Sequence, residues 1–129
     1  RKEAPPRPLK LLSHGGAEIW VGRNNLQNDQ LTLRFAERND LWFHVQKAHG
    51  SHVVARCTEE DGETVHAAAM LAAWYSEARE SSNVAVDYTL VRHVRKPSGA
   101  KPGMVIYTDQ RTIYVTPDRS YIEGLKGVK

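Results

Sequence analysis

The stretch VHAAAMLAAWYSEARE, residues 65–80, decides the fold because it carries the strongest helix signal in the chain. Asp61 and Thr64, just upstream, are candidate N-caps, since short polar side chains satisfy the free N–H groups of a first helical turn. The helix is apolar nearly all round from Ala67 to Tyr75. Either other parts of the chain cover both of its sides, or a partner protein covers one of them.

Strand patterns lie on both sides of this helix, together with one shorter helix. The shorter helix is expected to start near Asn25 or Asn28, with Leu31 and Phe35 at helical spacing. Strand character is present in residues 18–22, 41–45, 52–57, 84–94, 104–108 and 112–116. We expect the last two segments to pair as a hairpin through the short connection at Asp109.

The order of these elements indicates the fold class. It reads β-α-β-β-α-β-β-β, which is not the strict alternation of a parallel α/β fold. We therefore expect an α+β fold, a single domain with a largely antiparallel sheet packed by one long Ala-rich helix and a shorter helix. Three prolines and four Lys or Arg residues within the first ten positions predict an extended basic arm over residues 1–13. The domain is then expected over 14–118, followed by a tail over 119–129.

The composition narrows the class of protein. The 129 residues, 40% hydrophobic and 26% charged, suit one folded domain rather than a disordered chain. The single cysteine, Cys57, cannot form an internal disulfide, and no apolar run approaches the roughly 20 residues of a membrane span, so we expect a cytoplasmic protein. The net charge of +3 permits nucleic-acid binding without requiring it.

A polar cluster at the start of the shorter helix forms the first candidate site. It contains Arg23, Asn24, Asn25 and Asn28. A helix start with free N–H groups beside an arginine suits a phosphate group. The alternative is plain helix capping, which asparagines also provide in proteins that bind nothing at these positions.

A second candidate site surrounds the GSH motif. Asp40, Trp42, His44, Ser51 and His52 are expected to form one surface, because alternation places Trp42 and His44 opposite the apolar face of their strand. The hydroxyl and imidazole groups suit phosphate or a ribose 2′-OH, and Trp42 suits base stacking. Alternatively, Trp42 packs under the long helix and His44 bonds a buried carbonyl. The histidines could also bind a metal, but no second ligand cluster is visible.

A basic segment after the 84–94 strand completes the candidate sites. Arg95, Lys96 and Lys101 follow Arg92 and His93 closely enough in sequence to form one patch. Phosphate binding by these side chains competes with the simpler interpretation of a solvated sheet edge. No motif of nucleophilic catalysis or nucleotide hydrolysis is present, so we expect no enzyme, no catalytic residue, no metal and no cofactor.

These motifs together resemble the NFACT-R domain. The resemblance rests on VGRNNLQND, on DLWFHV with GSHVV, on the Ala-rich helix through Tyr75 and Ser76 into VDYT, and on GAKPGMVIY with TIYVTP. It implies a domain of factors that bind a large ribosomal subunit obstructed by peptidyl-tRNA, recruit tRNA and extend the stalled peptide, and in which this domain binds RNA. Bacterial members have also been labelled fibronectin-binding proteins. Where the family pattern leads us to expect proline before Gly50, this chain has His49.

Two functions of different classes follow. The first is an RNA-binding module for tRNA or ribosomal RNA, acting with the ribosome. The alternative is a protein-interaction module, for fibronectin or a ribosomal protein, that uses the apolar helix or a sheet edge. A metal-dependent hydrolase is a third hypothesis. Salt dependence separates the first two, because phosphate contacts release counterions.

Overall fold

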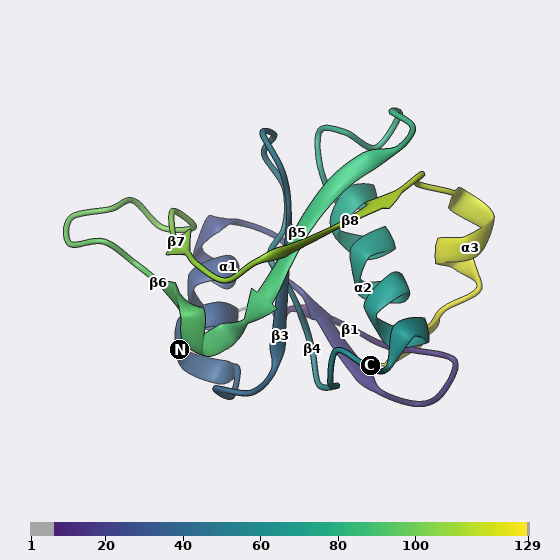
Figure 1. The fold of residues 1–129 in the computed structure, drawn as a ribbon, viewed down its shortest axis with the longest axis horizontal. Coiled ribbons are helices and arrows are strands. Elements are labelled where there is room, and N and C mark those ends of the chain that lie inside the picture. The colour runs from purple at the N-terminus through teal and green to yellow at the C-terminus, as the bar shows by residue number, and fades with distance from the viewer. Residues whose placement is uncertain (1–6, 129) are drawn as a thin grey trace, which may run out of the picture.

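The computed structural model describes residues 7–128, and it contains one seven-stranded sheet with helices on both faces (Figure 1). The sheet order is β8-β5-β3-β4-β2-β1-β9, with every neighbouring pair antiparallel. This arrangement confirms the α+β class and the largely antiparallel sheet. The strands of this sheet are β1 (Leu9–Leu12), β2 (Glu18–Val21), β3 (Leu41–Val45), β4 (Val53–Ala55), β5 (Val84–Leu90), β8 (Arg111–Val115) and β9 (Lys126–Val128). The other elements are α1 (Asn25–Gln30), α2 (Gly62–Trp74), α3 (Arg119–Glu123), the short strands β6 (Val94–Arg95) and β7 (Ile106–Tyr107), a π-helical turn (Leu31–Phe35) and a 3-10 turn (Val91–His93).

The sheet separates two hydrophobic cores. Leu41, Phe43 and Val45 of β3 face the larger core, which α2 covers. Trp42 faces the smaller core on the opposite side, where Leu31 and the hairpin residues Val91 and Val94 pack against it. The expected alternation along β3 is therefore correct, but both faces of the strand are covered.

Helix α2 begins with the Asp61 side chain, which accepts a hydrogen bond from the Thr64 backbone N–H at 3.2 Å. The helix ends at Trp74, six residues earlier than the sequence pattern suggests. Its alanines from Ala67 to Ala73 are fully buried inside the domain. The chain itself thus covers the apolar sides of α2, which is the first of the two alternatives that the sequence left open.

A long hairpin contains the basic segment of the sequence. β5 pairs with β8, and after the 3-10 turn the same two chain segments pair again as β6 with β7. Residues 96–105 form the tip of this hairpin and extend to one side of the molecule (Figure 1). The expected hairpin between 104–108 and 112–116 is wrong, because each segment is already paired elsewhere. Asp109, at a φ of 61°, adopts the left-handed backbone that redirects the chain between them.

Both ends of the described chain belong to the sheet. β1 pairs with β2 on one side and with β9 on the other. The proposed arm over 1–13 is therefore incorrect for residues 9–12, and residues 1–6 lie outside the described part. The tail expected over 119–129 instead contains α3 and β9. A short apolar segment such as LKLL, residues 9–12, gives little strand signal alone. It forms a strand here because it pairs with the edge of β2.

Candidate nucleic-acid interface

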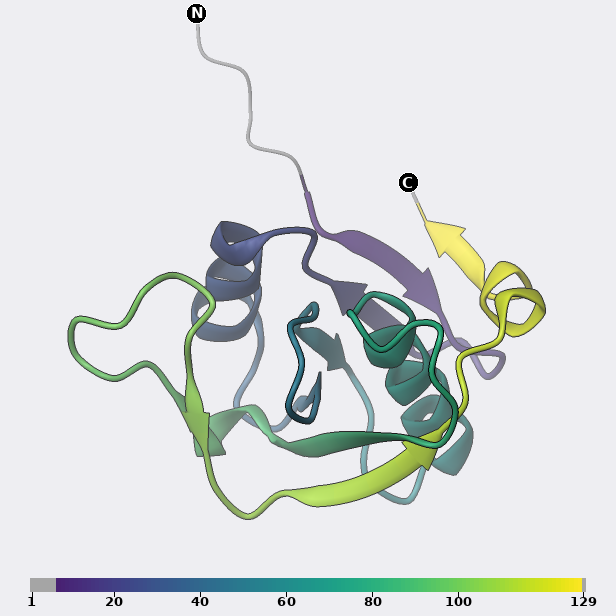
Figure 2. The same cartoon turned by 90° about the horizontal axis from the view of Figure 1, so that it is seen from above.

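The loop between β3 and β4, residues 46–52, separates two clefts on one side of the molecule. The larger, of about 1040 Å³, lies between this loop and the hairpin tip, and we call it the hairpin cleft. The smaller, of about 750 Å³, lies between the start of α1 and residues 74–79 at the end of α2, and we call it the helix-end cleft. Figure 2 looks down on the loop, with the hairpin tip and the chain after α2 on either side of it. The clefts adjoin, since both are lined by Asn25, Asn28, His49, Gly50 and Glu77.

The β3–β4 loop is fixed to the end of α2. The backbone N–H of Ser51 donates to the Tyr75 carbonyl at 2.9 Å, and that of Glu77 donates to the His49 carbonyl at 2.9 Å. Gly50 permits this approach, because a Cβ there would lie 2.8 Å from the Ser76 Cβ. The GSH motif therefore places Ser51 in the helix-end cleft, as part of its lining.

His52 connects three elements from a buried position. Its Nδ1 lies 2.8 Å from the Thr32 hydroxyl and its Nε2 lies 3.1 Å from the Gly103 carbonyl, while its backbone N–H donates to the Asn28 side chain at 3.1 Å. Burial, followed by the charge of His44, lowers the pKa of His52 to about 4. A neutral ring that donates from Nε2 and accepts at Nδ1 satisfies both contacts. His52 and Asn28 are thus buried supports of the clefts, not the exposed ligands that the sequence suggested.

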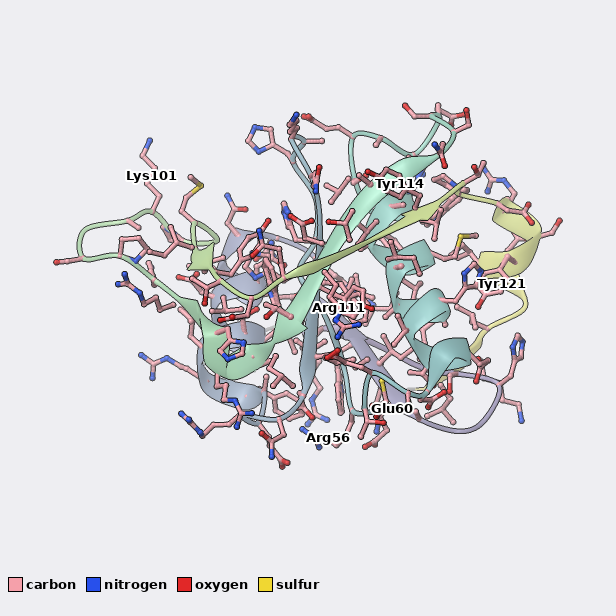
Figure 3. The ribbon with its side chains drawn as sticks, in the orientation of Figure 1. Arg56, Glu60, Lys101, Arg111, Tyr114 and Tyr121 are labelled. Carbon is pink, nitrogen blue, oxygen red and sulfur yellow. The ribbon has the colours of Figure 1, made fainter. Side chains whose placement is uncertain are left out.

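The hairpin tip is anchored on Asp29. The carboxylate accepts from the Lys96 ammonium and from the Gly103 backbone N–H, both at 2.7 Å. Burial alone would raise the pKa of Asp29, but these hydrogen bonds and the Lys96 charge outweigh it and lower that pKa. Lys96 therefore serves as an anchor. Lys101 is exposed, lines the hairpin cleft and extends from the loop away from the sheet (Figure 3). Arg95 is exposed but lines neither cleft.

Aromatic rings line the inner part of the hairpin cleft. Trp42 is fully buried, and its ring lies parallel to that of His44, with 5.8 Å between the centroids and 5° between the planes. Tyr107 packs on Trp42 at 4.7 Å and donates its hydroxyl proton to Asp87 at 2.7 Å. The expected surface position of Trp42 is wrong, because α1 and the hairpin cover it. His44 remains half-buried and lines the cleft, and burial lowers its pKa, which favours a neutral imidazole.

The start of α1 confirms the capping interpretation. Asn24 accepts from the Gln27 backbone N–H at 2.9 Å, and the Gln27 side chain accepts from the Arg23 backbone N–H at 2.9 Å. Asn24 rather than Asn25 or Asn28 is the N-cap. These contacts occupy backbone donors that a phosphate would need. The side chains of Arg23, Asn24 and Asn25 are nevertheless exposed, and all three residues line the helix-end cleft.

Asp40 lies at the opposite end of β3 from the clefts. It is buried and accepts two hydrogen bonds from Arg56, at 3.1 Å to Nε and 2.9 Å to Nη2, and a third from the Glu37 backbone N–H at 2.8 Å. The expectation that it shares a surface with His44 and Ser51 is incorrect. Its carboxylate is instead the partner that keeps the Arg56 guanidinium in place beside the Trp20 ring, at 4.8 Å.

Several lining residues are not evident from the sequence. Lys47 lies in the hairpin cleft at a φ of 56°, and its type gives no sign of this left-handed backbone. His49 lines both clefts. Its backbone N–H lies 3.4 Å from the Glu77 side-chain Oε1. A proline at position 49 has no N–H, so it would lose only this long contact. Arg79 lines the helix-end cleft with its guanidinium 4.3 Å from the Trp74 ring. The polar residues after Ser76 were the sequence signal for a lining position at Arg79. Their spacing also continues the pattern of the predicted helix, so the sequence did not reveal this position.

Residues 7–128 hold no group of three or more His, Cys, Asp or Glu side chains arranged to bind a metal ion. The same part of the chain has no helix with the length and apolar character to cross a membrane.

Comparisons with known proteins agree on one family. The model of the NFACT protein RNA binding domain matches residues 9–109. The Rqc2 homolog RqcH of Bacillus subtilis is 48% identical over 98% of this chain, and that of Streptococcus suis is 42% identical over 98%. The chain spans only 22% and 23% of these two relatives. A solved structure of the C-terminal part of the fibronectin/fibrinogen-binding protein from Streptococcus suis matches 98% of this chain and 52% of its own, with 41% identity and a TM-score of 0.92.

Proposed function

Because this chain belongs to the NFACT protein RNA binding domain family, we propose that it binds RNA through the groove formed by the hairpin and helix-end clefts. The observation that carries this proposal is the charge of the lining. Arg23, Lys47, Arg79 and Lys101 contribute cations, whereas Glu77 is the one carboxylate that lines either cleft within the described chain. A phosphate backbone is the ligand that such a lining favours.

The cations are available for phosphate contacts. Within residues 7–128, no ion pair joins Arg23, Lys47 or Lys101 to a carboxylate. Lys96, which the sequence also suggested as a ligand, is by contrast neutralised by Asp29. The proposed interface consists of Arg23, Asn24, Asn25, His44, Ser51 and Lys101 from the sequence-based set, together with Lys47, His49 and Arg79. Asn28, Trp42, His52 and Lys96 support it, and Asp40 and Arg95 lie outside it.

The biological RNA is proposed from the relatives. They carry the name Rqc2 homolog, which denotes ribosome-associated quality control. We propose that this chain contacts tRNA or large-subunit ribosomal RNA in a cytoplasmic ribosome complex, as a non-catalytic module. The remaining length of the relatives would then supply the other activities of such a factor.

Protein binding is the competing proposal, because one similar structure is described as part of a fibronectin/fibrinogen-binding protein. The buried state of α2 removes one of the surfaces expected for it. The outer edges of the sheet, at β8 and β9, stay available, and Tyr114 on β8 is 61% exposed. RNA is favoured because the cations lie in the groove.

The test is salt-dependent RNA binding with matched variants. The affinity for a tRNA should fall steeply between about 50 and 200 mM salt, as several phosphate contacts require. Lys47→Gly combined with Lys101→Ala should weaken binding at low salt and reduce the slope of log affinity against log salt by about 1 to 2. Arg111→Ala, which removes an exposed cation on β8, is the control and should change neither. Binding that is insensitive to salt, or equally weakened by the control, would contradict the proposed interface.

A further inference from the structure

We propose that the hairpin cleft holds an unpaired nucleotide of the RNA, with its base stacked on the His44 imidazole. This inference rests on the proposed function and adds the state of the RNA that the cleft accepts. The cations explain attraction to any phosphate backbone, but they do not explain why aromatic rings line the inner part of the cleft.

The first observation is a stack that stops at the cleft. Trp42 lies parallel to His44, and the His52 ring stands nearly perpendicular to both, with its centroid 5.3 Å from that of Trp42 and 5.6 Å from that of His44. Trp42 is fully buried, whereas His44 keeps part of its ring exposed to the cleft. A base that lies on this exposed part would continue the Trp42–His44 stack by one member. Burial lowers the pKa of His44, so the ring offers a neutral aromatic surface near neutral pH.

The second observation is an unused donor beside the same stack. The indole N–H of Trp42 is buried, and it has no hydrogen-bond partner within the described chain. Buried donors without an acceptor are rare in folded proteins and each calls for an explanation. The Nε1 atom is closed to solvent, so an oxygen atom of a nucleotide in the cleft would supply the missing acceptor only if the rings that cover it shift on binding.

The shape of the site selects an unpaired nucleotide over a duplex. The cleft, of about 1040 Å³, is a concave space between two loops, and its volume matches that of sites that enclose small ligands. Within a duplex the faces of the bases are already stacked on one another, and only the outer face of each terminal pair is free, whereas an unpaired base can offer its face to a protein ring inside a cleft. Lys47 and Lys101 line the same cleft, which suits the phosphates on either side of such a nucleotide.

The experiment compares two RNAs on the complete 129-residue chain. One is a blunt-ended duplex, and the other is the same duplex with a short 3′ overhang that contains 2-aminopurine. The overhang should raise the affinity by about tenfold, and the 2-aminopurine fluorescence should be quenched on binding, because stacking on an aromatic ring quenches it. His44→Ala should remove both effects, His44→Phe should retain them, and His66→Ala, an exposed histidine on α2, should leave both unchanged.

The outcomes separate this inference from the proposed function. Equal, salt-dependent binding of both RNAs without quenching would overturn the unpaired-nucleotide site and leave RNA binding in place. Binding of neither RNA would overturn both. If His44→Ala folds as the wild type does and keeps the preference for the overhang, the assignment of the stack to His44 is wrong. Loss of the preference in His44→Ala with recovery in His44→Phe supports it, since phenylalanine restores an aromatic face but not the hydrogen bonds of the imidazole with the backbone of Val45 and Gly50.

Discussion

Lowering the pH should destabilise this domain through His52. In the unfolded chain a histidine titrates near pH 6.5, whereas burial lowers the pKa of His52 to about 4 in the fold. Between these values the unfolded chain binds a proton that the folded chain does not, so acid favours unfolding. The stabilising contribution of the neutral ring is complete above about pH 6.5 and is lost as the pH falls toward 4.

The size of the effect follows from the same two values. The difference between 6.5 and about 4 corresponds to about 3 kcal/mol of unfolding free energy, of which about 2 kcal/mol is lost by pH 5. His44 adds a change of the same sign, because burial also lowers its pKa. The structural cause at His52 is its burial, followed by the charge of His44, whereas the hydrogen bond to the Gly103 carbonyl acts in the opposite direction.

The assay is urea unfolding at pH 7.5 and pH 5 for the wild type and His52→Gln, with His66→Gln as the control at an exposed histidine. Glutamine cannot titrate, so His52→Gln should lose about 2 kcal/mol less than the wild type between the two pH values, whatever its stability at pH 7.5. The control should behave as the wild type does. If the wild type and His52→Gln show the same pH dependence, the assignment of a buried His52 ring that the fold holds neutral is wrong.

Three further substitutions test the assignments made for the groove and for the opposite end of β3. Gly50→Ala should destabilise the fold by about 1 to 3 kcal/mol in urea unfolding, because the new Cβ would lie 2.8 Å from the chain that follows α2; Gly62→Ala, where a Cβ meets nothing within 4 Å, should not. Lys47→Gly should leave stability unchanged or raise it by up to about 1 kcal/mol, since glycine adopts the left-handed backbone freely, while filter binding shows weaker RNA affinity; a large loss of stability would refute this assignment. Arg56→Ala should cost about 2 kcal/mol of thermal stability by leaving the buried Asp40 carboxylate without its partner, and RNA affinity should stay the same; weaker binding by the folded variant would place Arg56 in the interface.

The fold was largely predictable from local patterns. The helix around Ala67–Ala73 and the alternation of β3 follow from the positions of apolar residues, and Asp61 follows from capping chemistry. The pairing of the strands was harder to predict from the sequence. The register of the long hairpin changes at the 3-10 turn Val91–His93, and sequence periodicity does not indicate which of two short strands pairs with which neighbour.

The candidate site was predicted only in part, because local patterns do not show which segments of the chain pack together. The sequence named candidates in three separate segments, among them Asn25, Ser51 and Lys101, and the structure places these three in the lining of adjoining clefts. It placed Trp42 at the surface because one face of β3 was taken to be solvent-exposed. The strand is covered on both faces, and that depends on where α1 and the hairpin pack, which the alternation of β3 does not encode. The predicted surface position of Asp40 was wrong for a similar reason, since its ion-pair partner Arg56 is sixteen positions away in the sequence.

The most direct test of the groove as the RNA-binding surface is an NMR titration of the isotopically labelled chain with a short RNA that carries a single-stranded end. We expect the largest amide shift changes in residues 23–25, 47–51, 75–79 and 99–104, which line the two clefts, and small changes along β8 and α3. Raising the salt concentration should reverse the changes. Changes confined to the β8 edge or to α3, with the cleft residues unmoved at saturating RNA, would contradict the proposed interface.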